Sequence, residues 1–177
     1  MDAQQDLVPA NQNSAELHHT YSIGAFSLQT NTTGYRNTSI GRNAMEYNTT
    51  GYGNSATGAY ALRFNTTGLD NTADGFASMY ANTTGSHNTA IGRGALAANT
   101  TGSRNTAYGG CALYANTTAN NNTAVGEGAM KSNTTGSYNT GIGRNSLQAT
   151  TTGLCNTGLG YGSLFANTTG CFNNAIG

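Results

Sequence analysis

The sequence predicts an all-β protein, a parallel β-solenoid of nine stacked coils built from a 17-residue unit. An asparagine recurs at every 17th position from Asn37 to Asn173, and the repeated unit reads N-T-A-x-G-x-x-A-L-x-x-N-T-T-G-x-x. A fixed short period indicates stacked units that each contact only their neighbours. The composition agrees: 25 glycines and no tryptophan leave little bulky mass for a conventional core, and seven basic plus seven acidic residues are too few for a disordered chain.

The chain divides into two parts. Residues 1–19 carry no repeat, are acidic through Asp2, Asp6 and Glu16, and contain the single proline, so we expect an N-terminal anchoring or docking arm. Residues 20–177 form the predicted solenoid domain. The N-terminus has neither the positive nor the apolar region of a classical signal peptide, and no later stretch is apolar enough to cross a bilayer, so the sequence predicts no membrane insertion.

Position 1 of the unit is the invariant asparagine. Coils stacked about 4.8 Å apart place identical side chains above one another, so each amide can donate to one neighbour and accept from the other. We therefore predict a structural asparagine ladder. Its members are Asn37, Asn54, Asn71, Asn88, Asn105, Asn122, Asn139, Asn156 and Asn173.

Position 9 is apolar in every unit and must face the interior. Positions 3 and 8 accept only small residues, which indicates close packing against other backbone. The core column consists of Leu28, Met45, Leu62, Met79, Leu96, Leu113, Met130, Leu147 and Leu164.

Positions 5 and 15 are glycine, except for Ala119 at one position 15, and mark corners that need positive φ or a tight bend. Between corners we expect short extended runs such as 89–91 and 99–101, which are rich in β-branched residues. Two threonine columns, from Thr32 and from Thr33, follow each other, and one is expected to face outward and the other inward.

One large apolar side chain per coil provides little burial against the entropy of ordering a whole coil of backbone, so we expect self-association. Position 4 is mostly apolar and fits an interface column. We predict a side-by-side homotrimer, and the open edge of the last coil favours end-to-end stacking. Further surface contacts are expected from Tyr47, Tyr60, Phe64, Tyr80, Tyr114 and Phe165.

Other motifs favour structural interpretations. The ten N-x-S/T sequons are better explained as ladder residues than as glycosylation sites, and a disulfide between Cys155 and Cys171 is conceivable but less favoured than free thiols. No zinc spacing, phosphate-binding loop or nucleophile elbow occurs, and the one acidic pair to consider is Asp70 with Asp74. The sequence therefore predicts no enzyme, no catalytic residue, no cofactor and no metal. Without a basic run it predicts no nucleic-acid partner.

The units Asn88–Gly92 and Asn122–Gly126, with their Asn-Thr-Thr-Gly turns, resemble the head repeats of trimeric autotransporter adhesins and the N-T-A-I-G repeats of phage tail fibres. The resemblance implies a left-handed β-roll, three chains side by side and binding of a host surface.

The function that we expect is a structural fibre, decoration or filament subunit of a virus particle or cell exterior, docked to a larger assembly through residues 1–19. An adhesin that binds host-surface glycans is the alternative. Ice binding is a minor alternative, because adjacent threonines point to opposite faces and give no flat paired array.

Overall fold

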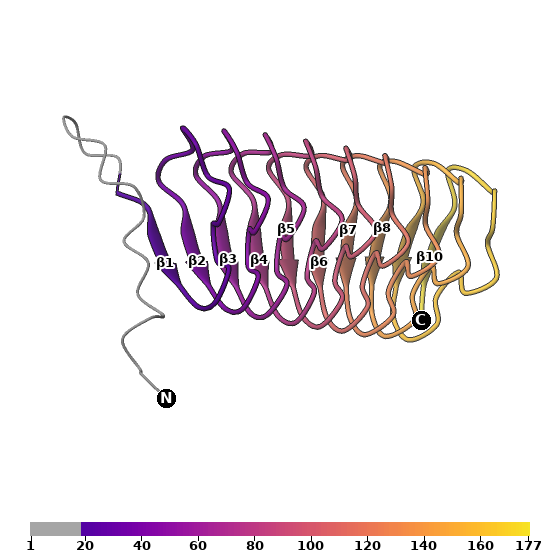
Figure 1. The fold of residues 1–177 in the computed structure, drawn as a ribbon. Coiled ribbons are helices and arrows are strands. Elements are labelled where there is room, and N and C mark those ends of the chain that lie inside the picture. The colour runs from indigo at the N-terminus through magenta and orange to yellow at the C-terminus, as the bar shows by residue number, and fades with distance from the viewer. Residues whose placement is uncertain (1–18) are drawn as a thin grey trace.

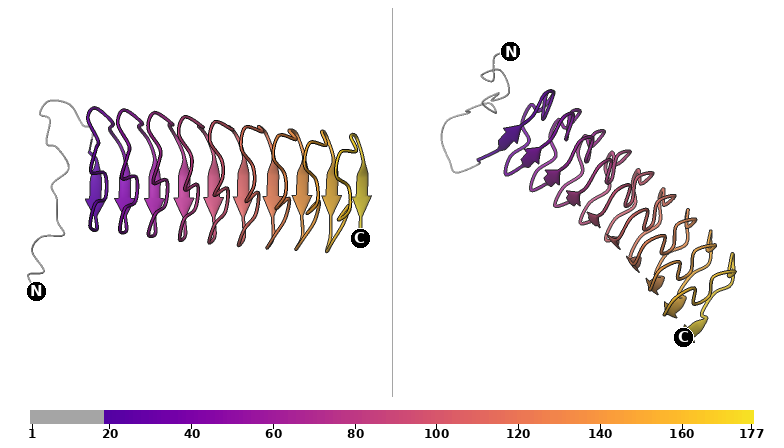
Figure 2. Two further views of the ribbon diagram at one scale, coloured as in Figure 1. Left: turned by 45° about the vertical axis from the view of Figure 1, so that its right-hand side comes forward. Right: turned by 90° about the horizontal axis from the view of Figure 1, so that it is seen from below.

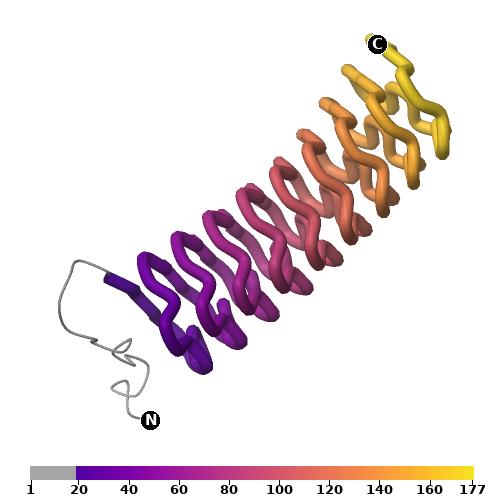
Figure 3. The backbone as a smooth tube through the Cα atoms, turned by 90° about the horizontal axis from the view of Figure 1, so that it is seen from above, coloured from indigo at the N-terminus to yellow at the C-terminus, as the bar shows by residue number. Residues whose placement is uncertain are grey.

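The structure, a computed structural model, describes residues 19–177, which form a single file of stacked coils (Figures 1 and 3). Apart from His19, the predicted N-terminal arm lies outside the described residues. Each coil carries one strand of three residues. The strands are Tyr21–Ile23 (β1), Thr38–Ile40 (β2), Ser55–Thr57 (β3), Thr72–Asp74 (β4), Thr89–Ile91 (β5), Thr106–Tyr108 (β6), Thr123–Val125 (β7), Thr140–Ile142 (β8), Thr157–Leu159 (β9) and Asn174–Ile176 (β10).

The ten strands form one parallel sheet in chain order, and every pair is shifted by one repeat unit. Ala90 of β5, for example, lies opposite Ala73 and Ala107. Figure 2 shows the strands side by side along the stack. Residues 19–177 contain no helix. The predicted all-β solenoid, its nine coils and its 17-residue unit are therefore confirmed, whereas the left-handed coil and the homotrimer stay predictions.

The rest of each coil consists of tight turns with an unusual number of left-handed residues. In the coil 88–104, φ is 127° at Gly92 (position 5), 66° at Gly94 (position 7), 52° at Leu96 (position 9) and 58° at Arg104 (position 17). Glycine adopts positive φ without strain, but a leucine there is uncommon. The position-9 side chain therefore reaches the interior through a locally strained backbone.

Residues 99–101 form no strand, so this predicted extended run is wrong. The N–H groups of Thr100, Thr101 and Gly102 all donate to the carbonyl oxygen of Thr117 in the next coil, at 2.9, 3.2 and 3.4 Å. Three successive amides can converge on one oxygen only where the chain bends, because the amides of a strand point alternately to opposite sides.

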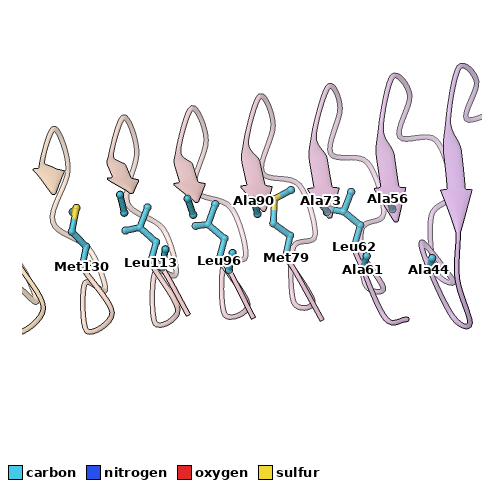
Figure 4. Close-up of a cluster of buried hydrophobic side chains, with 14 of the residues drawn as sticks. Ala44, Ala56, Ala61, Leu62, Ala73, Met79, Ala90, Leu96, Leu113 and Met130 are labelled. Carbon is cyan, nitrogen blue, oxygen red and sulfur yellow. The ribbon is translucent and has the colours of Figure 1, made fainter. Parts of the chain in front are cut away.

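The core is a narrow column inside the coils (Figure 4). Within it, the position-9 side chains from Met45 to Leu147 have no exposed surface, Leu28 is 8% exposed, and Leu164 packs against the cluster from a half-buried position. Alanines of positions 3 and 8, such as Ala90 and Ala95, are fully buried beside Leu96. Their small size allows the sheet and the opposite turns to approach each other across one layer of side chains.

The predicted asparagine ladder forms along the stack. In a typical step, the backbone N–H and the Nδ2 group of Asn88 both donate to Oδ1 of Asn71, at 3.0 and 3.1 Å. The same Nδ2 group donates to the carbonyl oxygen of Gly102 at 2.9 Å. Each amide thus joins two coils and also closes its own coil.

A second asparagine ladder occupies position 12, the column of the Asn-Thr-Thr sequons, which the sequence favoured as ladder residues. Nδ2 of Asn99 donates to Oδ1 of Asn82 at 2.8 Å and to the carbonyl oxygen of Gly102 at 2.9 Å. The side chains from Asn48 to Asn133 in this column are fully buried. The two ladders meet at the carbonyl oxygen of position 15, to which both amides donate.

Glycine at position 15 does not have positive φ, which was one of the two predicted reasons for it. Position 5 has positive φ, but the position-15 glycines do not. A Cβ atom on Gly102 would instead collide with the carbonyl oxygen of Ala119 and with Oδ1 of Asn99. Lack of space, not backbone conformation, selects glycine here.

Candidate ligand-binding groove and interaction faces

The threonine columns lie outside the core. Position 13 is half-buried in the inner coils, and its hydroxyl donates to the next coil, as from Thr100 to the carbonyl oxygen of Thr117 at 3.0 Å. Position 14, from Thr33 to Thr169, is exposed throughout. The expectation that one of these columns faces inward is wrong, because the inward position of this turn belongs to the asparagine of position 12.

The sequons of position 12 are structural in the folded chain. From Asn48 to Asn133 their side-chain amides are buried and donate to the ladder, so no glycan can be attached there without opening the coil. Asn31 and Asn167 at the ends are half-buried. Cys111, Cys155 and Cys171 are free thiols, and the sulfur of Cys171 accepts a hydrogen bond from the N–H of Leu154 at 3.3 Å.

A cluster of aromatic side chains surrounds Arg63 on the face formed by positions 6, 7, 10 and 11. Its guanidinium carbon lies 5.2 to 5.9 Å from the ring centres of Tyr47, Tyr60, Phe64 and Tyr80. The rings of Tyr47 and Phe64, one coil apart, stack with 5.1 Å between centroids. Cation–π contacts and stacking of this kind stabilise a surface cluster and fix the orientation of its rings.

Glu46 anchors this arginine. Nε of Arg63 donates to Oε2 of Glu46 at 2.7 Å, and Nδ2 of Asn43 donates to the same oxygen at 2.8 Å. Burial alone would raise the pKa of Glu46, but the hydrogen bonds from Arg63 and Asn43 outweigh it and hold the pKa below its ordinary value. The hydrogen bond with Glu46 in turn raises the pKa of Arg63. The pair is a charged, fixed support for the aromatic rings.

Beside this cluster runs a groove of about 870 Å³ that spans five coils. The residues of its floor are small because positions 7 and 11 carry alanine or glycine in two neighbouring coils, and position 10 is Ala97 in the second of them. Aromatic rings stand at both ends, and the Tyr114 ring lies against Gly94, 3.5 Å from where a Cβ would be. The lining residues are Tyr60, Arg63, Phe76, Ala77, Tyr80, Ala81, Arg93, Gly94, Ala97, Ala98, Cys111, Tyr114 and Lys131.

The predicted contact residues divide between these features. Tyr47, Tyr60, Phe64 and Tyr80 come together around Arg63, and Tyr60, Tyr80 and Tyr114 line the groove. Phe165 is half-exposed and lies three coils beyond Tyr114 in the same column.

Sequence reasoning missed the charged members of this face and Phe76. The signal was available, because position 10 reads Gln, Glu, Arg, Tyr, Ala, Tyr, Lys, Gln and Phe along the coils. Glu46 and Arg63 are therefore vertical neighbours, and the small side chain of Ala97 leaves a hollow between Tyr80 and Tyr114.

The outward face of the sheet forms a second surface. Position 3 of each strand points inward, so positions 2 and 4 point outward, and position 4 presents an apolar column. From β5 to β10 this column is uninterrupted, and Tyr108, Ile142 and Leu159 are 56%, 39% and 43% exposed. Asp74 interrupts it in β4. Its potential acidic partner, Asp70, lies 3.8 Å from Nδ1 of His87 and belongs to a different turn.

Within the described part of the chain, no three His, Cys, Asp or Glu side chains gather as a metal site would require. Residues 19–177 also contain no helix that could cross a membrane. The chain matches no protein-family model, no curated protein and no solved structure. The resemblance to adhesin heads and phage fibres therefore stays a prediction.

Proposed function

We propose that this protein is a structural rod, a fibre, decoration or filament subunit of a virus particle or other extracellular assembly. The observation that carries the proposal is the apolar position-4 column on the outward face of the sheet. Contiguous exposed apolar surface on a soluble protein marks an interaction site. A continuous column on a long, regular sheet suits a partner of the same shape, namely another copy of the chain.

The arrangement that we propose is a homotrimer of left-handed coils. In it, the position-4 columns from Ile91 to Ile176 face one another around a common axis. Such packing adds apolar burial to chains that each hold one large core side chain per coil. Asp74 and Thr57, which interrupt the column, would mark the polar end of the interface.

The mass of the full-length protein in solution tests the proposal. Sedimentation equilibrium should give three times the mass of one chain. The paired substitution Ile142→Lys and Leu159→Lys should give single chains, because it places charges on the face. Thr152→Lys with Thr169→Lys adds the same charge to the exposed position 14 of the same coils and should leave the mass unchanged. A single-chain mass for the unaltered protein at all concentrations would rule the assembly out.

A second candidate function is attachment to host-surface glycans, and the aromatic groove favours it. Ligand sites are concave, mostly apolar and lined by a few polar groups, and this groove has that composition. Attachment does not require the trimer, so the two functions can be tested separately. Binding of a glycan array to the full-length protein is the direct measurement.

A further inference from the structure

The groove beside the Arg63 cluster is built from positively charged donors, tyrosine hydroxyls and apolar surface. Its polar lining groups are the side chains of Arg63, Arg93, Lys131 and the tyrosines. Of residues 19–177, no Asp, Glu, Asn or Gln lines it. Arginine and lysine only donate hydrogen bonds, so a ligand that fits must be rich in acceptors.

Two of the cations are available for a ligand. Arg63 is committed to Glu46, whereas Arg93 and Lys131 form no ion pair with any described residue. The nearby Glu127 is paired with Arg144 at 3.2 Å. The groove is therefore net positive, and its excess charge lies on exposed side chains that can reach an anionic group.

The floor and walls favour ring-shaped units over a peptide strand. The backbone N–H groups of the floor are already used between coils, as from Ala81 to Ala97 at 2.9 Å and from Gly94 to Phe76 at 3.0 Å. The groove thus offers no free edge to which a peptide strand could add. Phe76 and Tyr114, which are 50% and 43% exposed, instead present apolar rings beside a floor of alanine, and the guanidinium carbon of Arg93 lies 6.0 Å from the Phe76 ring centre.

We propose that this groove binds an acidic oligosaccharide lying along the rod. Its carboxylate or sulfate groups would pair with Arg93 and Lys131, and the apolar faces of its sugar rings would lie on Phe76, Tyr114 and the alanine floor. Arg63 and Lys131, four coils apart, set a length of about 19 Å at about 4.8 Å per coil. The inference rests on the attachment function and is independent of the structural role.

Calorimetric titration of the full-length protein with a chondroitin sulfate hexasaccharide tests the proposal. We expect saturable binding that weakens with added salt. Arg93→Gln with Lys131→Gln should weaken it at least tenfold. Tyr114→Ala should weaken it several-fold without changing the salt dependence. Arg36→Gln with Arg104→Gln removes the same charge away from the groove and should have little effect.

The outcomes distinguish glycan attachment in general from a preference for acidic glycans. Equal affinity for a neutral dextran oligosaccharide would overturn the acidic specificity and leave attachment standing, whereas failure to bind any glycan would overturn both. Equal weakening by the Arg36 and Arg104 control would show nonspecific attraction, and equal affinity for poly-glutamate would show that the sugar rings are not recognised. Cys111 lines the groove, so bound hexasaccharide should also slow its alkylation in a variant with Cys155→Ser and Cys171→Ser.

Discussion

The side-chain amides of Asn88 and Asn99 donate to one acceptor, the carbonyl oxygen of Gly102, each at 2.9 Å. Asn88 belongs to the ladder of position 1, and Asn99 belongs to the ladder of position 12. The shared oxygen links the two ladders within each coil, while the Oδ1 contacts link each ladder between coils. A change in one ladder should therefore affect the other.

Replacing a ladder residue should be costly. Asn99→Ala removes the two hydrogen bonds that Nδ2 donates and the one that Oδ1 accepts from Asn116, and it leaves Oδ1 of Asn82 buried without its donor. Since each buried polar group that loses its partner costs about 1–3 kcal/mol, we expect the free energy of unfolding to fall by about 3 kcal/mol. Urea unfolding followed by circular dichroism measures it. Thr101→Ala, at the exposed position two residues away, should change it little, and an equally small effect of Asn99→Ala would contradict the ladder's role.

The ladder of position 12 has one break, which can be repaired. Among the described residues, Oδ1 of Asn133 is the single buried side-chain polar atom without a partner. The cause is Thr150, which stands where the next asparagine would donate. Thr150→Asn should restore the step and raise the free energy of unfolding by about 1 kcal/mol. Thr152→Asn, on the exposed side of the same turn, is the control. No gain from Thr150→Asn would show that another group satisfies this oxygen.

The single alanine at position 15 should weaken its turn. In the coil of Ala119, the N–H group of Thr117 donates to the carbonyl oxygen of Thr134, but the N–H groups of Thr118 and Ala119 do not. In the preceding coil, all three equivalent N–H groups donate to one carbonyl oxygen. We expect Ala119→Gly to stabilise the chain despite the flexibility of glycine, and Gly102→Ala to destabilise it by more than about 1 kcal/mol through collision with backbone. Thermal unfolding of the two variants should move in opposite directions, and a shift in the same direction would refute the steric explanation.

The Glu46–Arg63 pair should make stability depend on pH. Because the folded pKa of Glu46 lies below the ordinary value of 4.5, its contribution is present above that pH and is lost as the pH falls through the lower folded pKa. At pH 7 we expect Glu46→Gln to lower the free energy of unfolding by about 1–2 kcal/mol. This difference between the variant and the unaltered protein should shrink in acid. Glu127→Gln removes an exposed pair and should have almost no effect. A difference that is constant with pH would exclude this charge as its source.

The fold could be predicted from the sequence because a solenoid repeats its environment. Every coil samples the same positions, so a buried column such as that of Leu96 has only apolar members, and the ladder of Asn88 has only asparagine. The strand 89–91 was predictable from its β-branched residues. The second ladder was indicated by the Asn-Thr-Thr sequons, but its asparagines were not set out as a column, and in one coil Thr150 breaks the pattern.

The turns and the groove were harder to predict. Positive φ at Leu96 contradicts local backbone preference and arises because the coil must close around its core. The groove depends on which variable side chains become vertical neighbours and on small residues such as Ala97 and Gly94, which leave space. Sequence reasoning singled out the aromatic residues individually but did not combine them with Arg63 and Lys131.

Each strand pairs with residues one whole repeat unit away in the sequence, and this register determines how such a rod can change in length. Duplication or loss of a complete unit leaves every column continuous, so recombination between the repeated coding segments should yield longer or shorter rods that still fold. Insertion of a single residue would shift all downstream columns against those upstream. The gene is thus expected to tolerate changes in copy number far better than small frame-preserving insertions.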